Sequence, residues 1–454
     1  MNNVKISLTP AALKRAASFA YAAYTISLPA GSLGDLVACS AAYVGGRAVF
    51  AAADQSLTLF GAKPLRVWRE LTPARLRQIQ QELQVQWVDL TPGGGVAPCL
   101  MGGLPFDLAG QPAEFWADLA TGYVILPQLL FKQTPAGKTV TLLAPVSAHL
   151  AADLQELADQ VSALLVADPP TPAATPAVTG TELAVADWMQ LVDRSVAAIQ
   201  AGQLRKVVLA RQLAVTTGAH FDPVAILHRL AAQQVNTYRF LVESPQRAFI
   251  GATPERLVKA TATEYLTASV AGSAPRGATP AADQQLGAAL LADPKNQVEH
   301  QIVVQRIAKL LAPYTTAVTI GARQLLKNRD IQHIYHPLAG PRQAGSYLLD
   351  VVAALHPTPA LGGEPRAAAL AWLREHEAGR GLYGAPVGWL SLGADEGEFV
   401  VGLRSGVFSA QAGRLYAGCG IVAASHAATE RAETRLKFQP MLRGISDSWT
   451  IKRN

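Results

Sequence analysis

Two predicted strands and a predicted helix follow one another near the end of the chain, in the stretches EFVVGLRSGVFS (398–409), RLYAGCGIV (414–422) and ERAETRLK (430–437). If 399–408 is one strand, its alternation places Arg404 on the same face as Gly402 and Gly406. The guanidinium is then flanked on that face by two glycines, which leave open space around it. A planar anion has room to lie there against the sheet.

The next strand and the helix add complementary groups. The second strand ends in Gly-Cys-Gly (418–420), which leaves backbone N–H groups open to a ligand. Glu430, Glu433 and Lys437 recur at i, i+3 and i+7, so they share one helical face. An arginine, open amides, two carboxylates and a lysine together indicate a site for a carboxylate-bearing ligand and a divalent cation.

Composition limits the class of protein. The chain has 454 residues, half of them hydrophobic and 16% charged, so it can form one large core or two ordinary ones. The net charge is +6, but no four Lys or Arg residues are adjacent and aromatic residues make up only 7%. A nucleic-acid partner is therefore not expected, and the diffuse positive charge favours small anionic substrates.

The cysteines and the apolar segments predict the compartment. Cys39, Cys99 and Cys419 are odd in number and widely spaced, which favours a reducing environment over a disulfide or zinc framework. The apolar stretch at 16–24 is interrupted by polar residues, and no run of about 18 apolar residues occurs. We expect a soluble cytoplasmic protein with no membrane partner.

The periodicities indicate an α+β protein. Helical patterns occur at 148–166, 184–201 and 296–312, and strand patterns at 138–146, 205–215, 237–243 and 247–252. Successive strands are joined by hairpins more often than by helices, which favours antiparallel sheets. The run DPPTPAATPAVTGT (168–181) is interpreted as a surface connection.

Three other short motifs suggest different kinds of site. The segment 418–423 matches GxGxxA, but too little chain follows it for a dinucleotide-binding fold. His333 and His336 in HIYH have no nearby partners for a zinc site, and the glycines at 93–95 lack the Lys-Ser/Thr of a phosphate loop. No GxSxG or HExxH motif is present.

Six motifs in a fixed order carry a resemblance to a known family: RKVVLARQ (205–212), FIGATPERLVK (249–259), SVAGSAPRG (269–277), KNQVEHQIVV (295–304), HPTPALGG (356–363) and the run from 383 to 437. With them the sequence resembles the chorismate-utilising enzymes, which include anthranilate synthase component I and the isochorismate, salicylate and aminodeoxychorismate synthases. The resemblance implies a large α/β sandwich of two antiparallel sheets with helices outside. It also implies a variable amino-terminal half (1–180) that contributes to the same sandwich and a chorismate-binding catalytic region (185–446).

The resemblance assigns an acid and a base. Making isochorismate requires water to add at C2 of chorismate while the C4 hydroxyl leaves. Lys206 matches the lysine that activates the water, and it must lose its proton near neutral pH, which burial and the neighbouring Arg205 favour. Glu255 matches the general acid, which needs a raised pKa in order to donate a proton.

The same resemblance implies a Mg²⁺ cofactor. Glu299 and Glu433 match the two metal ligands, and Glu430 matches a contact made through water. Glu299 is predicted on the same helical face as Ile302 and Val303. An apolar face disfavours a charged carboxylate unless a cation binds to it.

The remaining site residues match contacts to the substrate. They are Gly272, Ser273, His333, Ala360, Tyr383, Arg404, Gly418, Cys419, Gly420 and Lys437. Two of these depart from the family pattern: Ser273 replaces a usual Thr and keeps the hydroxyl, and Cys419 replaces a common Ala. We expect both changes to be tolerated.

Within the family, three positions favour isochorismate synthase, and the length and lone-enzyme organisation favour the menaquinone type. Ala271 stands where aminodeoxychorismate synthases have a lysine. Lys206 matches a water-activating lysine that anthranilate synthases lack. Ala360 stands where salicylate and anthranilate synthases commonly have a threonine. No glutaminase subunit is then expected. The alternatives are a salicylate synthase, isochorismate supply for a siderophore, or a non-catalytic chorismate-binding relative.

Overall fold

Strand β6 (Tyr123–Thr134) is the branch point of the fold. The computed structural model describes residues 5–111, 113–171 and 175–452. One edge of β6 pairs along its length with β3 (Thr58–Trp68), whereas its other edge pairs first with β5 (Cys99–Gly103) and then with β7 (Gly137–Pro145). Two arms of sheet therefore diverge from this strand.

The first arm runs, in spatial order, through β4 (Trp87–Asp89), β1 (Tyr21–Leu28), β7, β6, β3, β2 (Ala48–Ala51), β10 (Tyr238–Glu243), β11 (Ala248–Thr253), β20 (Ser405–Phe408), β21 (Ala412–Ile421), β9 (Lys206–Thr217), β8 (Val178–Glu182) and β22 (Trp449–Lys452). A short strand, β17 (Gly363–Glu364), pairs with the start of β9. The second arm runs from β6 through β5, β18 (Pro386–Ser391), β19 (Gly397–Val401), β12 (Arg256–Ala260), β13 (Glu264–Pro275) and β16 (Ile331–Pro341), which also pairs with β14 (Thr319–Ile320) and β15 (Gln324–Lys327).

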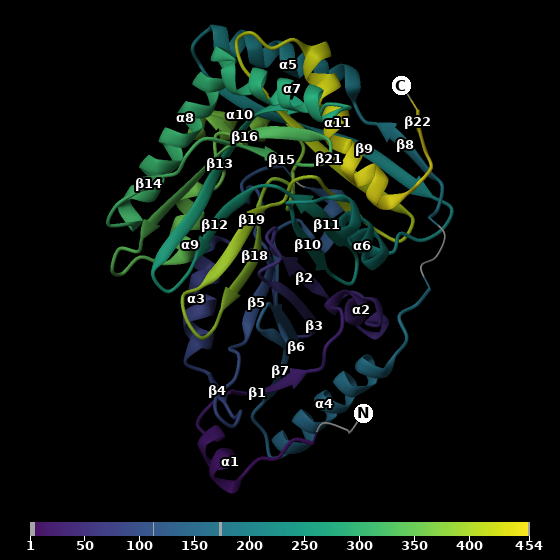
Figure 1. Cartoon of the computed structure of the whole chain (residues 1–454), viewed down its shortest axis with the longest axis vertical. Helices are drawn as coiled ribbons and strands as arrows, with labels where there is room; N and C mark the ends of the chain where they lie inside the picture. Colours follow the sequence, from purple (N-terminus) through teal and green to yellow (C-terminus); the bar gives the residue numbers. More distant parts are fainter. Residues whose placement is uncertain (1–4, 112, 172–174, 453–454) are drawn as a thin grey trace.

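Helices cover the outer faces of both arms (Figure 1). Those of the described chain are α1 (Pro10–Ala16), α2 (Leu33–Ala38), α3 (Pro73–Gln84), α4 (Leu150–Val166), α5 (Val185–Gln200), α6 (Pro223–Gln233), α7 (Pro280–Ala292), α8 (Pro294–Leu311), α9 (Leu348–Leu355), α10 (Arg366–His376) and α11 (Ala427–Ile445). Figure 1 shows α3, α8 and α9 on one side of the strands and α2, α4 and α6 on the other. The strands and helices expected between 138 and 312 are confirmed as β7, α4, α5, β9, β10, β11 and α8.

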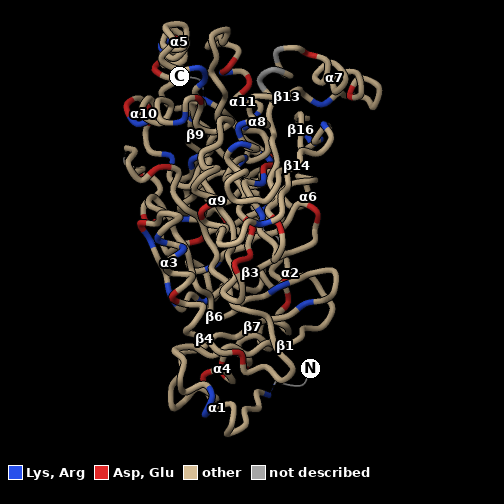
Figure 2. The backbone as a smooth tube through the Cα atoms, turned by 90° about the vertical axis from the view of Figure 1, so that its left-hand side faces the viewer, with Lys and Arg blue, Asp and Glu red and all other residues tan. Residues whose placement is uncertain are grey.

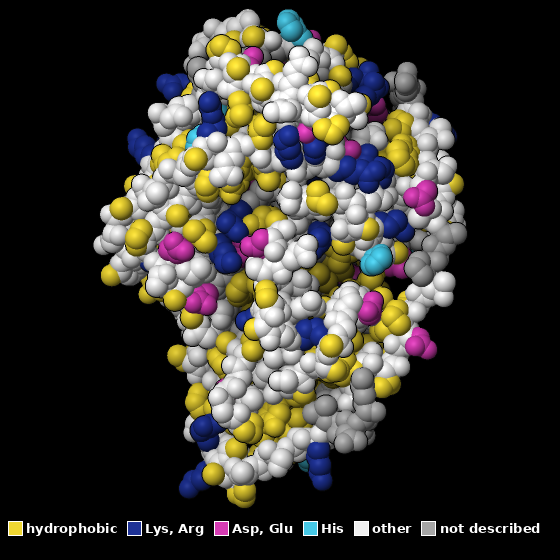
Figure 3. All heavy atoms as spheres, in the orientation of Figure 1, with side chains coloured by type: hydrophobic (Ala, Val, Ile, Leu, Met, Phe, Trp, Pro, Cys, Tyr) yellow, Lys and Arg dark blue, Asp and Glu magenta, His cyan; other side chains and the backbone are white. Residues whose placement is uncertain are grey.

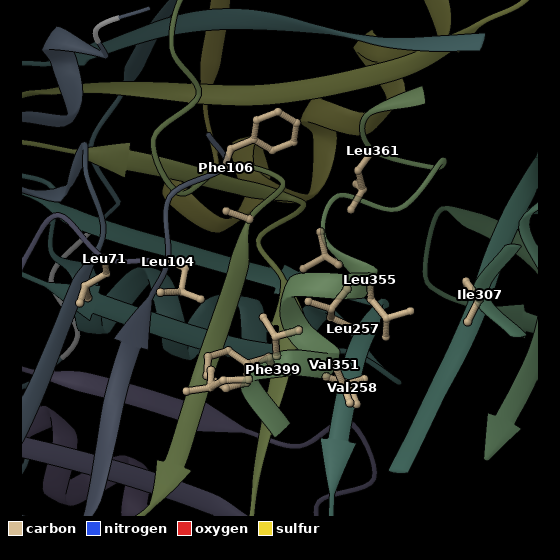
Figure 4. Packing of buried hydrophobic residues seen from close by; sticks show 14 of the residues in the cluster. Leu71, Leu104, Phe106, Leu257, Val258, Ile307, Val351, Leu355, Leu361 and Phe399 are labelled. Atoms are coloured by element: carbon tan, nitrogen blue, oxygen red, sulfur yellow. The ribbon is translucent and has the colours of Figure 1, made fainter. Parts of the chain in front are cut away.

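Three hydrophobic clusters define the layers. The inner cluster joins side chains of both arms, including Phe50, Phe249, Val387 and Val400. An outer cluster packs α3, α8 and α9 against the second arm, and part of it is seen in Figure 4. The other outer cluster packs α2, α4, α6 and the end of α11 against the first arm. The expected α+β sandwich is confirmed, but its two layers are one hydrogen-bonded network joined at β6, and the β1–β4 and β8–β22 pairs are parallel.

The prediction of a surface connection over 168–181 is wrong for its last residues. Val178–Glu182 forms strand β8, which pairs with β9 and β22. Its burial alternates, with Val178, Gly180 and Glu182 inward, but so short a period-2 pattern is hard to see behind a proline-rich run. Residues 172–174 of that run lie outside the described part of the chain.

Strands from the first 180 residues pair directly with strands that come much later. Val387 pairs with Gly103 and Leu241 with Val49. Lys and Arg are spread along the backbone, and on the face in Figure 3 they lie in small separate groups (Figures 2 and 3). Among the described residues no helix combines the length and apolar character needed to cross a membrane.

Candidate active site

A cavity of about 230 Å³ lies where β9 and β21 approach β13, β16 and α11. Most of the residues predicted for the site line this one cavity, although they come from distant parts of the chain. They are Lys206, Glu255, Gly272, Ser273, His333, Ala360, Tyr383, Arg404, Gly418, Gly420, Glu430, Glu433 and Lys437.

Two predicted residues stand apart from this group. Cys419 is buried and does not line the cavity; its thiol contacts the carboxyl group of Glu430, and burial raises the pKa of that thiol. Glu299 is on α8, but its side chain lies outside the described part of the structure. The apolar face proposed for it is only partly present, because Val303 is buried while Ile302 is 51% exposed.

Arg404 reaches the cavity in a different way from that predicted. The expected strand over 399–408 is broken: β19 ends at Val401 and β20 begins at Ser405. Arg404 itself has a φ of 48°, a left-handed conformation that costs a residue other than glycine about 1–3 kcal/mol. Such strain at a cavity residue is typical of a functional position. The guanidinium makes no hydrogen bond to any described residue, so its donors can meet a ligand.

A bulge in β13 forms the opposite wall. The register with β16 shifts between Ala271 and Ser273, and Gly272 at the bulge has a φ of +73°. The Ser273 hydroxyl lies 2.9 Å from Nδ1 of His333. Burial, reinforced by Arg404 and Lys437, lowers the pKa of His333 to about 3. His333 is therefore neutral at physiological pH and can only form hydrogen bonds with a ligand.

Glu255 occupies the turn between β11 and β12. Its side chain is 6% exposed, and its backbone N–H donates to the Thr253 hydroxyl. Burial raises the pKa of Glu255 to about 7, although Arg404 and Lys206 oppose the increase. The carboxyl group can therefore hold a proton near neutral pH, as a general acid must.

This pKa predicts the alkaline limb of the pH profile. A general acid works only while protonated, so kcat/KM should fall as the pH rises through about 7 and Glu255 ionises. Glu255→Gln should have a much lower rate, and its profile should lack this alkaline decline. The check is kcat/KM from pH 5.5 to 9 for both proteins; a wild-type profile that stays flat to pH 9 would show that Glu255 is not the acid.

Helix α11 presents its acidic face to the cavity. Glu433 Oε1 lies 2.5 Å from Lys437 Nζ, which also donates to the Gly418 carbonyl at 2.9 Å. Burial opposes ionisation of Glu433, but Lys437 and Arg404 lower its pKa. Burial raises the pKa of Glu430, and the nearby Glu433 adds to the increase.

The donor chemistry of this face fits a hard divalent cation. Glu430 and Glu433 offer carboxylate oxygens one helical turn apart, and repulsion between them is relieved by a cation. No group of three or more possible ligands occurs among the described side chains. The third carboxylate expected here is that of Glu299.

Comparisons with known proteins agree with this geometry. A family model described as chorismate binding enzyme matches residues 12–446. The chain belongs to the chorismate-binding enzyme family. It is 34% identical over 354 residues to the isochorismate synthase MenF of Bacillus subtilis, covering 77% of this chain and 75% of the relative. It is 35% identical over 381 residues to the salicylate biosynthesis isochorismate synthase of Pseudomonas aeruginosa, covering 82% and 79%. The solved structure of the menaquinone-specific isochorismate synthase MenF of Escherichia coli shares the fold, with a TM-score of 0.80, 23% identity and coverage of 96% and 99%.

Other residues of this chorismate-binding enzyme line the cavity and were not predicted. They are Val208, Pro254, Val270, Ala271, Asn296, Leu361, Arg380, Gly384, Leu403, Val422 and Ser425. Ser425 contacts the Glu430 carboxyl group, and Asn296 lies so close to Gly272 that a Cβ there would be 3.1 Å from its Oδ1. Arg380 is the first residue of the stretch RGLYGAPVGW (380–389). Nothing in that stretch shows which atoms its guanidinium contacts.

Proposed function

We propose that this chain is an isochorismate synthase, a magnesium-dependent isomerase that converts chorismate to isochorismate. The observation that carries the proposal is that Lys206 and Glu255 line one cavity together with Arg404 and Lys437. A base, an acid and two cations for the two carboxylates of chorismate are thereby available around one small ligand. The relatives described as isochorismate synthases support the same reaction.

Each side chain has a task in this reaction. Lys206 removes a proton from the water that adds at C2, and Glu255 gives its proton to the hydroxyl that leaves C4, from the other side of the ring. Arg404 can bind a carboxylate through two parallel N–H donors, and Lys437 and the Tyr383 hydroxyl border the same space. A Cβ at Gly418 would stand 3.1 Å from that hydroxyl, so glycine leaves room for Tyr383.

Magnesium would be held by Glu433 and Glu299, with Glu430 reached through water. When bound, Mg²⁺ neutralises and polarises the ring carboxylate of the substrate. We propose a role in menaquinone biosynthesis, supported by the similarity to the structure described as a menaquinone-specific isochorismate synthase. We propose that the protein is cytoplasmic, and its three free cysteines support this. The division of the chain at residue 180 stays a prediction.

The test is the identity of the product. Purified protein with chorismate and Mg²⁺ should give isochorismate, reversibly, with no need for glutamine or ammonium. Chromatography should show the same product when either nitrogen source is added. Salicylate with pyruvate as the main product would instead support a salicylate synthase, and an aminated product would support a glutamine-dependent relative.

A further inference from the structure

A buried ion pair lies at one edge of β9, between the segment that pairs with β17 and the segment that pairs with β8. At the start of β9, Lys206 and Val207 pair with β17, and pairing with β8 begins at Leu213. Between them, the Val208 carbonyl and the Ala210 N–H pair with no described strand on that edge. Arg380 and Glu377 occupy this position with side chains only 5% and 8% exposed.

The hydrogen bonds of the pair are directed at the backbone. Arg380 Nη2 donates to the Val208 carbonyl at 2.6 Å, and Nη1 donates to the Leu361 carbonyl at 3.1 Å. Nε and Nη2 also donate to Glu377 Oε2 at 2.8 and 2.7 Å. The other Glu377 oxygen accepts from the Ala210 N–H at 2.7 Å. Four of the five N–H groups of Arg380 are thereby directed at the protein itself, so it differs from Arg404.

Arg380 also contacts the turn that carries Tyr383 and one residue of the amino-terminal half. The Arg380 carbonyl accepts from the Tyr383 N–H at 2.9 Å, which fixes the turn that carries Tyr383. Phe106, from the amino-terminal half, lies 4.5 Å from the guanidinium and donates its N–H to the Gly381 carbonyl at 2.8 Å. Phe106 and Leu361 belong to the same hydrophobic cluster (Figure 4).

We propose that Arg380 and Glu377 are positioning residues that hold the Lys206 strand, the 360–361 wall and the Tyr383 turn in one arrangement. A planar guanidinium can reach the Val208 and Leu361 carbonyls at once, whereas a lysine ammonium is a single point of charge. Loss of the fork allows the base to move relative to the bound ring, and a displacement of about 1 Å can cost roughly 10²-fold in rate. This inference rests on the proposed function.

The test uses two variants of the 454-residue chain. Arg380→Lys keeps the charge but loses the fork, and Arg380→Met with Glu377→Gln removes both charges, so no unpaired charge remains buried. Each should lower kcat for chorismate roughly 10–100-fold and change KM less than about threefold. The double variant Arg47→Met with Glu243→Gln is the matched control, because in that pair too the guanidinium donates two hydrogen bonds to one carboxylate. Both side chains are 3% exposed, and neither lines the cavity. The control should lose thermal stability and keep the kcat of wild type.

The outcomes separate this inference from the proposed function. If folded Arg380→Lys keeps wild-type kcat, or if the control loses kcat as much as the Arg380 variants do, the positioning role is wrong. If wild type itself does not turn over chorismate, the proposed function fails, and amide hydrogen exchange then decides the positioning role. Peptides covering 206–211 and 360–363 should exchange faster in the Arg380 variants than in wild type and the control; unchanged exchange would overturn it.

Discussion

Replacing Lys206 with alanine should lower kcat for chorismate about 10²–10⁴-fold, the range typical of losing one positioned proton-transfer group. KM should change far less, because Arg404, Tyr383 and Lys437 remain to bind the carboxylates. Steady-state kinetics on the purified variant measures both constants. Lys259→Ala, in β12 and outside the cavity lining, is the control and should behave as wild type.

Lys206→Arg separates a base from a positive charge. Arginine keeps the charge but does not lose its proton at the pH of the assay, so this variant should be as slow as the alanine variant. If Lys206→Arg keeps most of the activity, Lys206 acts electrostatically. If Lys206→Ala keeps kcat and only raises KM, Lys206 binds substrate and another group activates the water.

Replacing Glu433 should nearly abolish turnover, by more than about 10²-fold, since a carboxylate that holds the cation cannot be replaced by an amide of the same shape. Glu433→Gln is the variant of choice, and Glu299→Ala should have a similar effect. The Glu433 side chain is 41% exposed, so the fold should tolerate the change. Mg²⁺ should raise the melting temperature of wild type but not of Glu433→Gln.

Glu375→Gln, on α10 and outside the cavity lining, provides the control for this series. It should keep both turnover and the stabilisation by Mg²⁺. Wild type stripped with a chelator should be inactive and recover on addition of Mg²⁺. Full activity in excess chelator would show that the carboxylates of α11 serve another purpose.

The sequence predicted which residues line the cavity better than it predicted the path of the chain there. Glu433 and Lys437 could be placed on one face because helical spacing is regular, and the family resemblance grouped Lys206 with Glu255, which line the same cavity. The path of the chain at Arg404 could not be read in this way. Alternation predicted a continuous strand, but the chain leaves the sheet at Gly402, and the left-handed conformation of Arg404 depends on the surrounding tertiary structure.

Two other features depend on partners that are distant in sequence. Strand β8 is stabilised by pairing with β9 and β22, which are distant in sequence. The proline-rich run before it therefore gave no local indication of a strand. The Arg380–Glu377 pair meets the backbone of Val208, Ala210 and Leu361, and hydrogen bonds to main-chain atoms leave no signature in side-chain spacing. Such contacts become visible only in the three-dimensional structure.

In the proposed reaction, water adds at C2 of chorismate while the C4 hydroxyl leaves. Wild type should be incubated with chorismate and Mg²⁺ in H₂¹⁸O, and the products of the first few per cent of conversion resolved by liquid chromatography and mass spectrometry. The isochorismate formed should carry one ¹⁸O atom at C2. Isochorismate without ¹⁸O would contradict the addition of water, and the absence of isochorismate would contradict the proposed function.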